Sequence, residues 1–316
     1  MRYGLIVLLV FGITFMSCKK DDNGVITIPP SLLSDVAPED DEAIREFLNT
    51  HFYNYEDFAP ETMPDGFDYK IVIDTIAGVN ADKRSLMEDA ESVSINVSSS
   101  FLGLSAGEED IPHTLYYIEV RKGEGGSPTY ADSTLVKYQG SLLDGTLFDE
   151  SQDFIWQELP FTVRGYANGV SKFSAGTADQ VVENADGTSE ISNSGLGIIV
   201  MPSGLAYFNS SAGQAGAYSP LLFKIELGLY VEDTDNDNDG IPSIDEDLNG
   251  NGYMYDDNTD ADDETTSVLA NFRDPDDDGD GVSTHSEITD SNGNIIFPYP
   301  DANNDGIPDY LDPKVN

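Results

Sequence analysis

The sequence predicts an α+β domain at the centre of the chain, formed by short strands around one short helix. Three observations support this prediction: a hairpin signal over residues 134–151, one helical stretch over 163–170, and a closing strand with alternating apolar residues over 221–230. Two further strands are expected, over 115–120 and 197–202. Strands that outnumber helices and surround one of them are typical of a mixed fold rather than a parallel α/β fold.

The hairpin signal is the most specific of the three. Apolar residues alternate from Val136 to Leu142, which places their side chains on one face of a strand. The pair Asp144-Gly145 follows and favours a type I′ turn, in which both central residues have positive φ. The second strand contains Phe148 and Asp149. Period and turn alone predict only a hairpin, and most hairpins are structural.

The residue order in this hairpin, Tyr-x-Gly-x-Leu-x-Asp-Gly-x-x-Phe-Asp, resembles the core signature of the FKBP-type peptidyl-prolyl cis-trans isomerases. The resemblance extends over about 113–230 and implies a half-open antiparallel sheet curled over a short helix. It also implies an aromatic pocket, whose residues by motif are Tyr138, Phe148, Asp149, Val163, Tyr166, Tyr207 and Phe223. In that family Val163 and Tyr166 would form the floor, and Asp149 and Tyr207 would be the polar groups.

The implied reaction needs neither a cofactor nor a nucleophile. Rotation about an X-Pro bond has a barrier of about 18–20 kcal/mol that arises mainly from amide resonance. An apolar pocket can desolvate the amide and favour its twisted form. The lack of a Ser/His/Asp or Cys/His set in the sequence is therefore compatible with an enzyme that binds proline-containing polypeptides.

Three departures from the family pattern leave a second interpretation open. Tyr166 replaces the usual tryptophan, Phe208 stands where a glycine usually follows Tyr207, and the loop 212–220 lacks the usual Ile-Pro pair. A polar insertion also occupies 177–194. The alternative is an FKBP-like binding module with weak catalysis.

The charge of the chain is strongly negative and uneven. The 316 residues carry a formal net charge of -44, and residues 232–316 contain 25 acidic against 2 basic residues. Nucleic acid would be repelled by such a surface, so nucleic-acid binding is excluded as the main function. The charge indicates cation binding instead.

The start of the chain has the features of an export signal. Residues 1–18 contain Arg2, an apolar run too short to span a bilayer, and Phe15-Met16-Ser17-Cys18, which resembles a lipobox. The resemblance implies cleavage before Cys18 and its lipidation, and the alternative is an ordinary secretory signal. Cys18 is the only cysteine of the chain, which favours the lipobox.

The residues that follow divide into a tether and an N-terminal segment. Residues 19–39 contain three prolines and are expected to be a tether. The segment 40–112 is expected to begin with a helix over 40–52 and to contain strands over 69–76 and 93–97. The central domain then covers 113–231.

The acidic region, residues 232–316, contains repeated Asp-x-Asp-x-Asp-Gly patterns. They match the twelve-residue calcium loop, which has oxygen ligands at positions 1, 3 and 5, glycine at 6, a backbone carbonyl at 7 and Glu at 12. The loops that begin at Asp235 and Asp276 are complete, whereas those at Asp247 and Asp301 are partial. The expected ligands are Asp235, Asp237, Asp239, Ile241, Glu246, Asp247, Asn249, Asn251, Asp276, Asp278, Asp280, Val282, Glu287, Asp301, Asn303, Asp305, Ile307 and Asp312.

The alternative for this region is a solvated acidic tail, but the regular glycine position favours structural calcium. Because long amphipathic helices do not flank the loops, they resemble thrombospondin type 3 repeats more than paired EF-hands. Little apolar sequence is available for a core, so we expect calcium to fold the region. The sequence thus predicts a lipid-anchored isomerase of the outer membrane, periplasmic or at the cell surface, which assists the folding of exported proteins. The alternative is a calcium-stabilised surface lipoprotein with a binding module.

Overall fold

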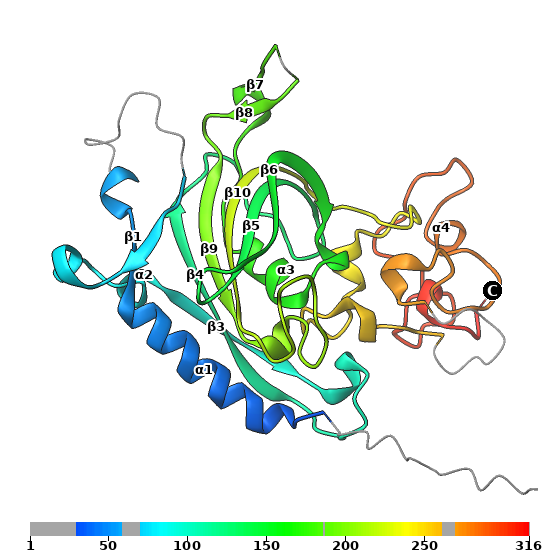
Figure 1. The fold of residues 1–316 in the computed structure, drawn as a ribbon. Helices are drawn as coiled ribbons and strands as arrows, with labels where there is room; N and C mark the ends of the chain where they lie inside the picture. Colours follow the sequence, from blue (N-terminus) through cyan, green and yellow to red (C-terminus); the bar gives the residue numbers. More distant parts are fainter. Residues whose placement is uncertain (1–29, 59–69, 186, 261–268, 316) are drawn as a thin grey trace, which may run out of the picture. The chain divides into compact units, whose positions relative to one another are not determined.

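A computed structural model describes residues 30–58, 70–185, 187–260 and 269–315. Its centre is a six-stranded antiparallel sheet with the order β3-β4-β9-β10-β5-β6. The strands are β3 Glu91–Val97, β4 Ile111–Arg121, β5 Ser133–Leu142, β6 Leu147–Glu158, β9 Gly195–Met201 and β10 Leu221–Val231. The sheet curls around α3, Arg164–Val170 (Figure 1). The predicted α+β class with a sheet around one short helix is therefore confirmed.

The two faces of the sheet carry two different apolar cores. On the concave side, α3 contributes Tyr166 and Val170 to a core that also contains Phe223 of β10. Gly169 allows α3 to approach β9, because a Cβ at this position would lie 2.6 Å from Ile199 Cδ1. The convex side carries the second core, in which Ile198 and Leu222 pack with residues of α1.

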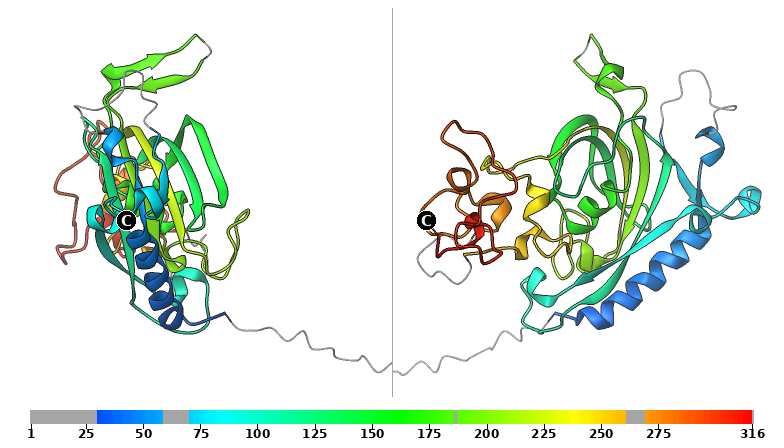
Figure 2. Two further views of the ribbon diagram at one scale, coloured as in Figure 1. Left: turned by 60° about the vertical axis from the view of Figure 1, so that its left-hand side comes forward. Right: turned by 180° about the vertical axis from the view of Figure 1, so that it is seen from behind.

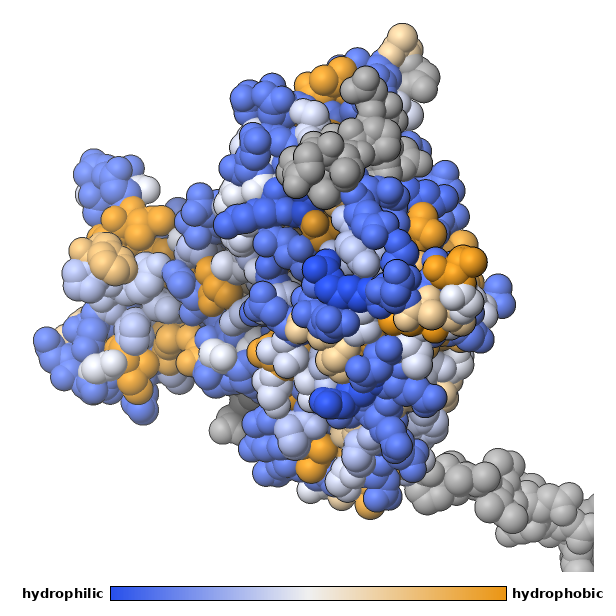
Figure 3. Space-filling model, turned by 90° about the vertical axis from the view of Figure 1, so that its left-hand side faces the viewer, coloured by the Kyte–Doolittle hydropathy of each residue, from blue (hydrophilic) through white to orange (hydrophobic). Residues whose placement is uncertain are grey.

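Helix α1, Leu33–Thr50, lies across the convex side (Figures 1 and 2). Its buried stripe includes Ile44, Phe47 and Leu48. Figure 3 shows the side of the molecule on which α1 lies, and this surface is predominantly hydrophilic with small apolar groups between the polar ones. The helix thus has an amphipathic pattern that matches its place between the sheet and solvent.

The start of α1 corrects the expected tether over 19–39 and the expected helix over 40–52. The helix begins at Leu33 and ends at Thr50, with Pro38 inside it. The backbone N–H groups of Leu33 and Ser34 donate to the carboxylate of Glu108, at 2.6 and 3.1 Å. A carboxylate from a distant loop therefore caps the helix, and no local sequence pattern could have revealed it.

The remaining elements are short. They are β1 His51–Tyr53, β2 Ile73–Thr75, α2 Leu86–Asp89, β7 Val181–Glu183, β8 Ser189–Ile191 and α4 Thr284–Glu287. The insertion at 177–194 forms the β7–β8 hairpin that projects from the sheet in Figure 1. The strand predicted over 93–97 is β3, whereas only 73–75 of the strand predicted over 69–76 is observed, and residue 69 lies outside the described residues.

The N-terminal segment is joined to the central domain through the sheet itself. β3 pairs with β4 over its whole length, from Glu91 opposite Tyr117 to Val97 opposite Ile111. The boundary expected at residue 113 therefore lies within β4. Among the described helices, none combines the length and apolarity that crossing a membrane requires; residues 1–18, with the expected lipobox and Cys18, lie outside the described part.

A buried carboxylate connects α1 to the turn after β9. Asp40 accepts hydrogen bonds from the Ser203 backbone N–H at 2.7 Å and from its hydroxyl at 2.6 Å. Burial raises the pKa of Asp40, although both hydrogen bonds oppose this shift. Because Ser203 begins the turn that leads to Tyr207, α1 supports one wall of the predicted pocket.

Replacement of Asp40 by alanine is expected to lower the free energy of unfolding by about 1–3 kcal/mol, since it leaves the Ser203 donors buried without their acceptor. Chemical denaturation of the full chain measures this change. Glu42→Ala, on the exposed side of the same helix, is the matched control and should change stability by less than about 0.5 kcal/mol. Equal stability of the two variants would contradict the role of Asp40.

Candidate active site and acidic loops

The hairpin predicted at 134–151 is formed by β5 and β6, but its turn differs from the expected type I′. Only Gly145 of the central pair has positive φ, at 86°. The Gly145 N–H donates to the Leu142 carbonyl at 3.0 Å, and the Leu142 N–H donates to the Thr146 carbonyl at 2.9 Å. The Asp144 carboxylate accepts from the Thr146 N–H at 2.9 Å. This side-chain contact favours a longer turn that ends in a left-handed glycine.

Four of the predicted pocket residues form one aromatic cluster on the concave face. The ring of Phe223 lies at the centre, with its centroid 5.0 Å from that of Tyr166, 5.6 Å from that of Phe148 and 6.4 Å from that of Tyr138. The contacts of Phe223 with Tyr166 and Phe148 are edge-to-face, which stabilises the cluster beyond the burial of area alone. We call these four residues the aromatic cradle.

Gly140 permits the close approach of the cradle rings. A Cβ at this position would lie 2.8 Å from Phe148 Cζ and 2.8 Å from Phe223 Cε1. The glycine of the Tyr-x-Gly motif therefore has a packing role, which the sequence pattern alone did not reveal.

Asp149 is exposed and joins the cradle through Tyr138. The Tyr138 hydroxyl donates to Asp149 Oδ2 at 2.9 Å. Burial, with the neighbouring Asp149 carboxylate, raises the pKa of Tyr138 to about 12, so the phenol remains protonated and keeps donating at neutral pH. The arrangement holds a carboxylate at the rim of an apolar cluster.

The hydroxyl of Tyr166 has a partner within the domain. Tyr166 is buried, and its hydroxyl donates to Gln157 Oε1 on β6 at 2.7 Å. Where the resemblance implies a tryptophan, this chain thus has a phenol whose polar end is satisfied by Gln157. Gln157 could not be predicted as this partner from the sequence, because a glutamine nine residues away in the chain carries no local signal.

The two remaining predicted residues border the cradle. Val163 precedes α3 as its N-terminal cap residue and packs against the concave core. Tyr207 lies in the turn after β9, where burial and then the charge of Asp149 raise its pKa. Phe208 follows with a φ of 45°, and its buried ring lies 5.0 Å from that of Tyr218. The structure thus brings the seven predicted residues to one side of the sheet.

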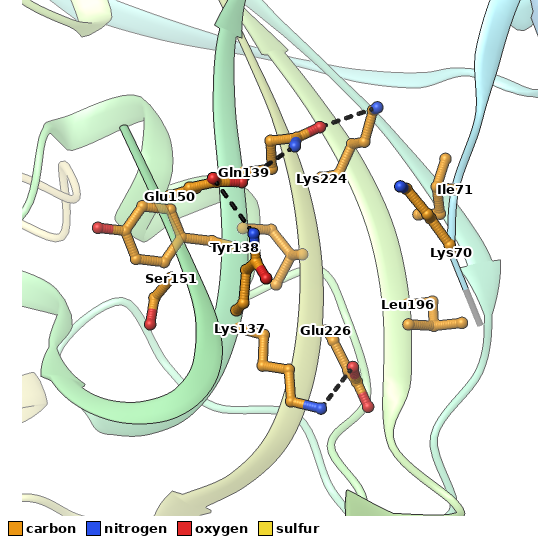
Figure 4. A pocket seen from close by; sticks show the side chains of 12 residues that line it. Lys70, Ile71, Lys137, Tyr138, Gln139, Glu150, Ser151, Leu196, Lys224 and Glu226 are labelled. Atoms are coloured by element: carbon orange, nitrogen blue, oxygen red, sulfur yellow. Dashed lines mark hydrogen bonds and ion pairs between the residues drawn. The ribbon is translucent and has the colours of Figure 1, made fainter. Parts of the chain in front are cut away.

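A groove on the opposite face of the sheet is lined largely by polar and charged side chains, unlike the aromatic cradle. It has a volume of about 360 Å³ and is lined in part by Lys137, Gln139 and Lys224 (Figure 4). Lys137 pairs with Glu226 at 3.5 Å, and Lys224 donates to Gln139 Oε1 at 3.1 Å. The ring of Tyr138 points away from these lysines in Figure 4. These polar groups pair with one another, so the candidate active site lies on the aromatic, concave face.

The four acidic loops share one backbone geometry. In each, the carboxylate at position 1 accepts from the N–H of the glycine at position 6, at 2.8–3.2 Å. These glycines all have positive φ: Gly240 105°, Gly252 74°, Gly281 95° and Gly306 94°. The partial loops at Asp247 and Asp301 therefore fold like the complete ones.

Several loop carboxylates are buried without hydrogen-bond partners. In the described part of the chain, both carboxylate oxygens of Glu246 and of Asp277 and one of Asp239 lack a partner. These three side chains come within 4.8 Å of one another, and Asp276, Asp278 and Asp280 form a second such group. Burial of unpaired carboxylates is costly, so these groups fit a hard divalent cation with oxygen ligands.

Two candidate ligands, Asp277 and Asp257, were not among the ligands predicted from the sequence. Asp277 occupies position 2 of the third loop but lies beside Asp239 and Glu246 of the first loop. Asp257, at position 11, accepts from Asn249 Nδ2 at 3.0 Å, and its Oδ2 is buried without a hydrogen-bond partner. Both residues lie one position away from the twelve-residue pattern, which is why spacing alone did not select them.

The acidic region has more apolar packing than expected. Ile241, Ile288 and Tyr310 form one small core, and Met254 and Phe272 form another with Ala131 of the central domain. The region therefore has two small apolar cores, although the sequence indicated little apolar material for one. Each of these cores contains only a few buried residues, whereas many carboxylates of the region are buried.

Parts of the chain are similar to known proteins. The family described as BamM C-terminal matches residues 236–300. A probable FKBP-type peptidyl-prolyl cis-trans isomerase FkpA of Neisseria meningitidis serogroup B is 29% identical over 135 residues, which cover 40% of this chain and 43% of that protein. The FKBP-type peptidyl-prolyl cis-trans isomerase FkpA of Aeromonas hydrophila is 27% identical over 180 residues, which cover 54% and 57%. The chain thus spans about half the length of the curated relatives it matches.

Among solved structures, two similar chains are a peptidyl-prolyl cis-trans isomerase of Pseudomonas syringae pv. tomato and FkpA of Escherichia coli. The first is 25% identical with a TM-score of 0.30 and covers 37% of this chain and 76% of its own. The second is 26% identical with a TM-score of 0.30 and covers 37% and 48%.

Proposed function

We propose that this chain is an FKBP-type peptidyl-prolyl cis-trans isomerase that acts on proline-containing segments of exported polypeptides. The observation that carries the proposal is the aromatic cradle with Asp149 held at its rim by Tyr138. Sequence similarity to curated isomerases supports the same enzyme class.

The geometry of the cradle supports catalysis through preferential binding of the twisted amide. The rings of Tyr138, Phe148 and Phe223 would surround the proline ring and exclude water from the amide, which favours the twisted amide over the planar one. The Tyr207 hydroxyl would donate to a substrate carbonyl. No proton transfer or covalent step is required, because no bond is broken.

We also propose that the acidic loops bind structural calcium and that a lipid on Cys18 anchors the protein to the outer membrane, facing the periplasm or the cell surface. The buried, unpartnered carboxylates of the loops support the first point. The lipobox-like sequence supports the second, and Cys18→Ser should release the protein from the membrane fraction if it is right.

The proposal is tested by isomerase turnover of the purified full chain on a proline-containing peptide, with calcium present. Turnover that an FKBP-type ligand inhibits is the expected result. If calcium-loaded protein binds the peptide without turnover, the alternative holds, a catalytically weak binding module in a surface lipoprotein. The departures at Tyr166 and Phe208 are the observations that favour this alternative.

A further inference from the structure

A group of three carboxylates joins the first acidic loop, 235–246, to the third, 276–287. One oxygen each of Asp239, Glu246 and Asp277 lie within 4.8 Å of one another. Asp239 and Glu246 belong to the first loop, whereas Asp277 belongs to the third. The group is therefore built from two segments that are distant in the sequence.

The three side chains are shielded from solvent and lack donors. Asp239 and Asp277 are 1% exposed, and Glu246 is 2% exposed. Oδ2 of Asp239 and both carboxylate oxygens of Glu246 and Asp277 have no hydrogen-bond partner among the described residues. Adjacent buried carboxylates repel one another unless a proton or a cation lies between them. The three side chains therefore fit a cation held between the two loops.

Asp277 stands apart from the ligand group of its own loop. Its backbone N–H at position 2 donates to Thr284 Oγ1 at position 9, at 3.1 Å, and this bond closes the third loop. Its side chain is not part of the group that the carboxylates at positions 1, 3 and 5 of that loop form. Position 2 is acidic in this loop alone, since the other loops have Asn236, Leu248 and Ala302 there.

The first loop lacks a free ligand at position 9. In calcium loops this position contributes a ligand, often through water. Here it is Ser243, which is buried, and its hydroxyl oxygen accepts from the Asn236 backbone N–H at 3.1 Å and from Asn236 Nδ2 at 2.9 Å. Two accepted hydrogen bonds occupy both lone pairs of a hydroxyl oxygen. Asp277 can therefore supply the oxygen that Ser243 cannot.

Other contacts hold the first and third loops together. His285 Nδ1 lies 3.0 Å from the Asp239 carbonyl oxygen and donates to it in the tautomer with a proton on Nδ1. Ile241 of the first loop and Ile288, directly after the third, share one small apolar core. These contacts keep Asp277 beside the first loop before an ion binds.

We propose that the calcium ion of the first loop is shared with the third loop through Asp277, so that one ion cross-links the two loops and couples their folding. The inference rests on the proposed binding of calcium by the acidic loops, and it adds a ligand that the twelve-residue pattern does not contain. Calcium accepts about six to eight oxygen ligands. The four carboxylates and one carbonyl of the first loop therefore leave room for the carboxylate of Asp277.

The first loop is itself attached to the central sheet. The Ser133 backbone N–H, at the start of β5, donates to Thr234 Oγ1 at 2.9 Å, and the Thr234 N–H donates to Asp132 Oδ1 at 3.2 Å. The Ser243 N–H donates to the Thr234 carbonyl at 2.9 Å. A shared ion would thus connect the third loop to the central domain through the first.

Calcium titration of the full chain, followed by hydrogen exchange, tests the shared ion, with segments 235–246 and 276–287 observed separately. Asp277→Asn should raise the calcium concentration that half-protects 235–246 by about tenfold or more, because loss of even an outer partner of a metal ligand costs about 10- to 100-fold in affinity. The midpoint of 276–287 should rise less, since that loop retains every ligand that the pattern assigns to it. At saturating calcium both segments should regain the protection of the unaltered chain.

A reciprocal variant keeps the test decisive if Asp277→Asn fails to fold. Glu246→Gln changes only the first loop, yet it should raise the calcium midpoint of 276–287, because coupling between two binding sites is reciprocal. Asp245→Asn removes an exposed carboxylate next to Glu246. This matched control should leave both midpoints unchanged.

The outcomes separate the shared ion from the calcium binding on which it rests. An unchanged midpoint of 235–246 in Asp277→Asn, or of 276–287 in Glu246→Gln, would overturn the shared ion. A shift confined to 276–287 in Asp277→Asn would restrict the carboxylate to its own loop and overturn it as well. If calcium protects no segment of 232–316 in the unaltered chain, the proposed calcium binding itself fails.

Discussion

Removal of calcium at pH 7.5 is expected to unfold much of residues 232–316 while the central sheet remains folded. Burial and neighbouring carboxylates raise the pKa of Glu246 to about 10 and that of Asp277 to about 9. At neutral pH the ion-free fold must therefore either keep protons on these groups or bury their charges. A cation removes this cost, and each site at 100 times its Kd adds about 2.7 kcal/mol to the free energy of unfolding.

The sign of the pH dependence follows from the raised pKa values. In the ion-free protein, the folded state holds protons that the unfolded state releases above about pH 4–5. Its stability should therefore fall as pH rises from about 5 to 9. With calcium bound, protons compete with the ion, so stability should fall as pH decreases. Hydrogen exchange of peptides from 232–316, with calcium or chelator at pH 5 and 7.5, measures both trends.

Variants identify which carboxylates cause this behaviour. Glu246→Gln with Asp277→Asn should make the ion-free region less sensitive to pH and weaken calcium binding. Glu232→Gln alters an exposed carboxylate at the start of the region and is the matched control. Unchanged exchange on chelation at pH 7.5 would contradict a calcium-dependent fold, and the small apolar cores around Ile241 and Phe272 would then suffice.

Local sequence patterns predicted the strands and the helix whose formation depends on neighbouring residues. Alternation, the Asp-Gly turn and one short helical stretch located β5, β6, β10 and α3, because strand and helix periods are properties of neighbouring residues. The same patterns failed where a distant group decides the structure. α1 begins at Leu33 because Glu108 caps it, and the Asp144 carboxylate rather than the Asp-Gly pair alone sets the hairpin turn.

The candidate site shows the same division. The resemblance to the FKBP-type family selected the residues of the aromatic cradle, because each occupies a position of the family pattern. It did not select Gln157, which satisfies the buried Tyr166 hydroxyl, or Arg164, which connects α3 to an acidic loop. Such contacts join segments that are distant in the sequence, and no regular spacing of residues marks them. They are therefore visible only in the folded chain.

Asp149→Ala is expected to reduce turnover roughly 10- to 100-fold without loss of stability. Asp149 is exposed, and its hydrogen bond with the Tyr138 hydroxyl is exposed as well, so water can replace the lost acceptor. A hydrogen bond to a charged group contributes about 1.5–3 kcal/mol, and each factor of ten in rate corresponds to about 1.4 kcal/mol. Turnover and the free energy of unfolding are measured on the same preparations. Asp153→Ala removes another exposed carboxylate of β6 and should retain full turnover.

The double variant decides how Asp149 acts. If Tyr138 fixes the carboxylate at the rim of the cradle through its 2.9 Å hydrogen bond, Tyr138→Phe should lower turnover in the same direction as Asp149→Ala. The combined variant should then be little worse than Asp149→Ala alone, because the second change removes an interaction that is already lost. Additive losses would show that the two groups act separately on the substrate. Full turnover in Asp149→Ala would remove the carboxylate from the site, and catalysis would rest on the aromatic rings and Tyr207.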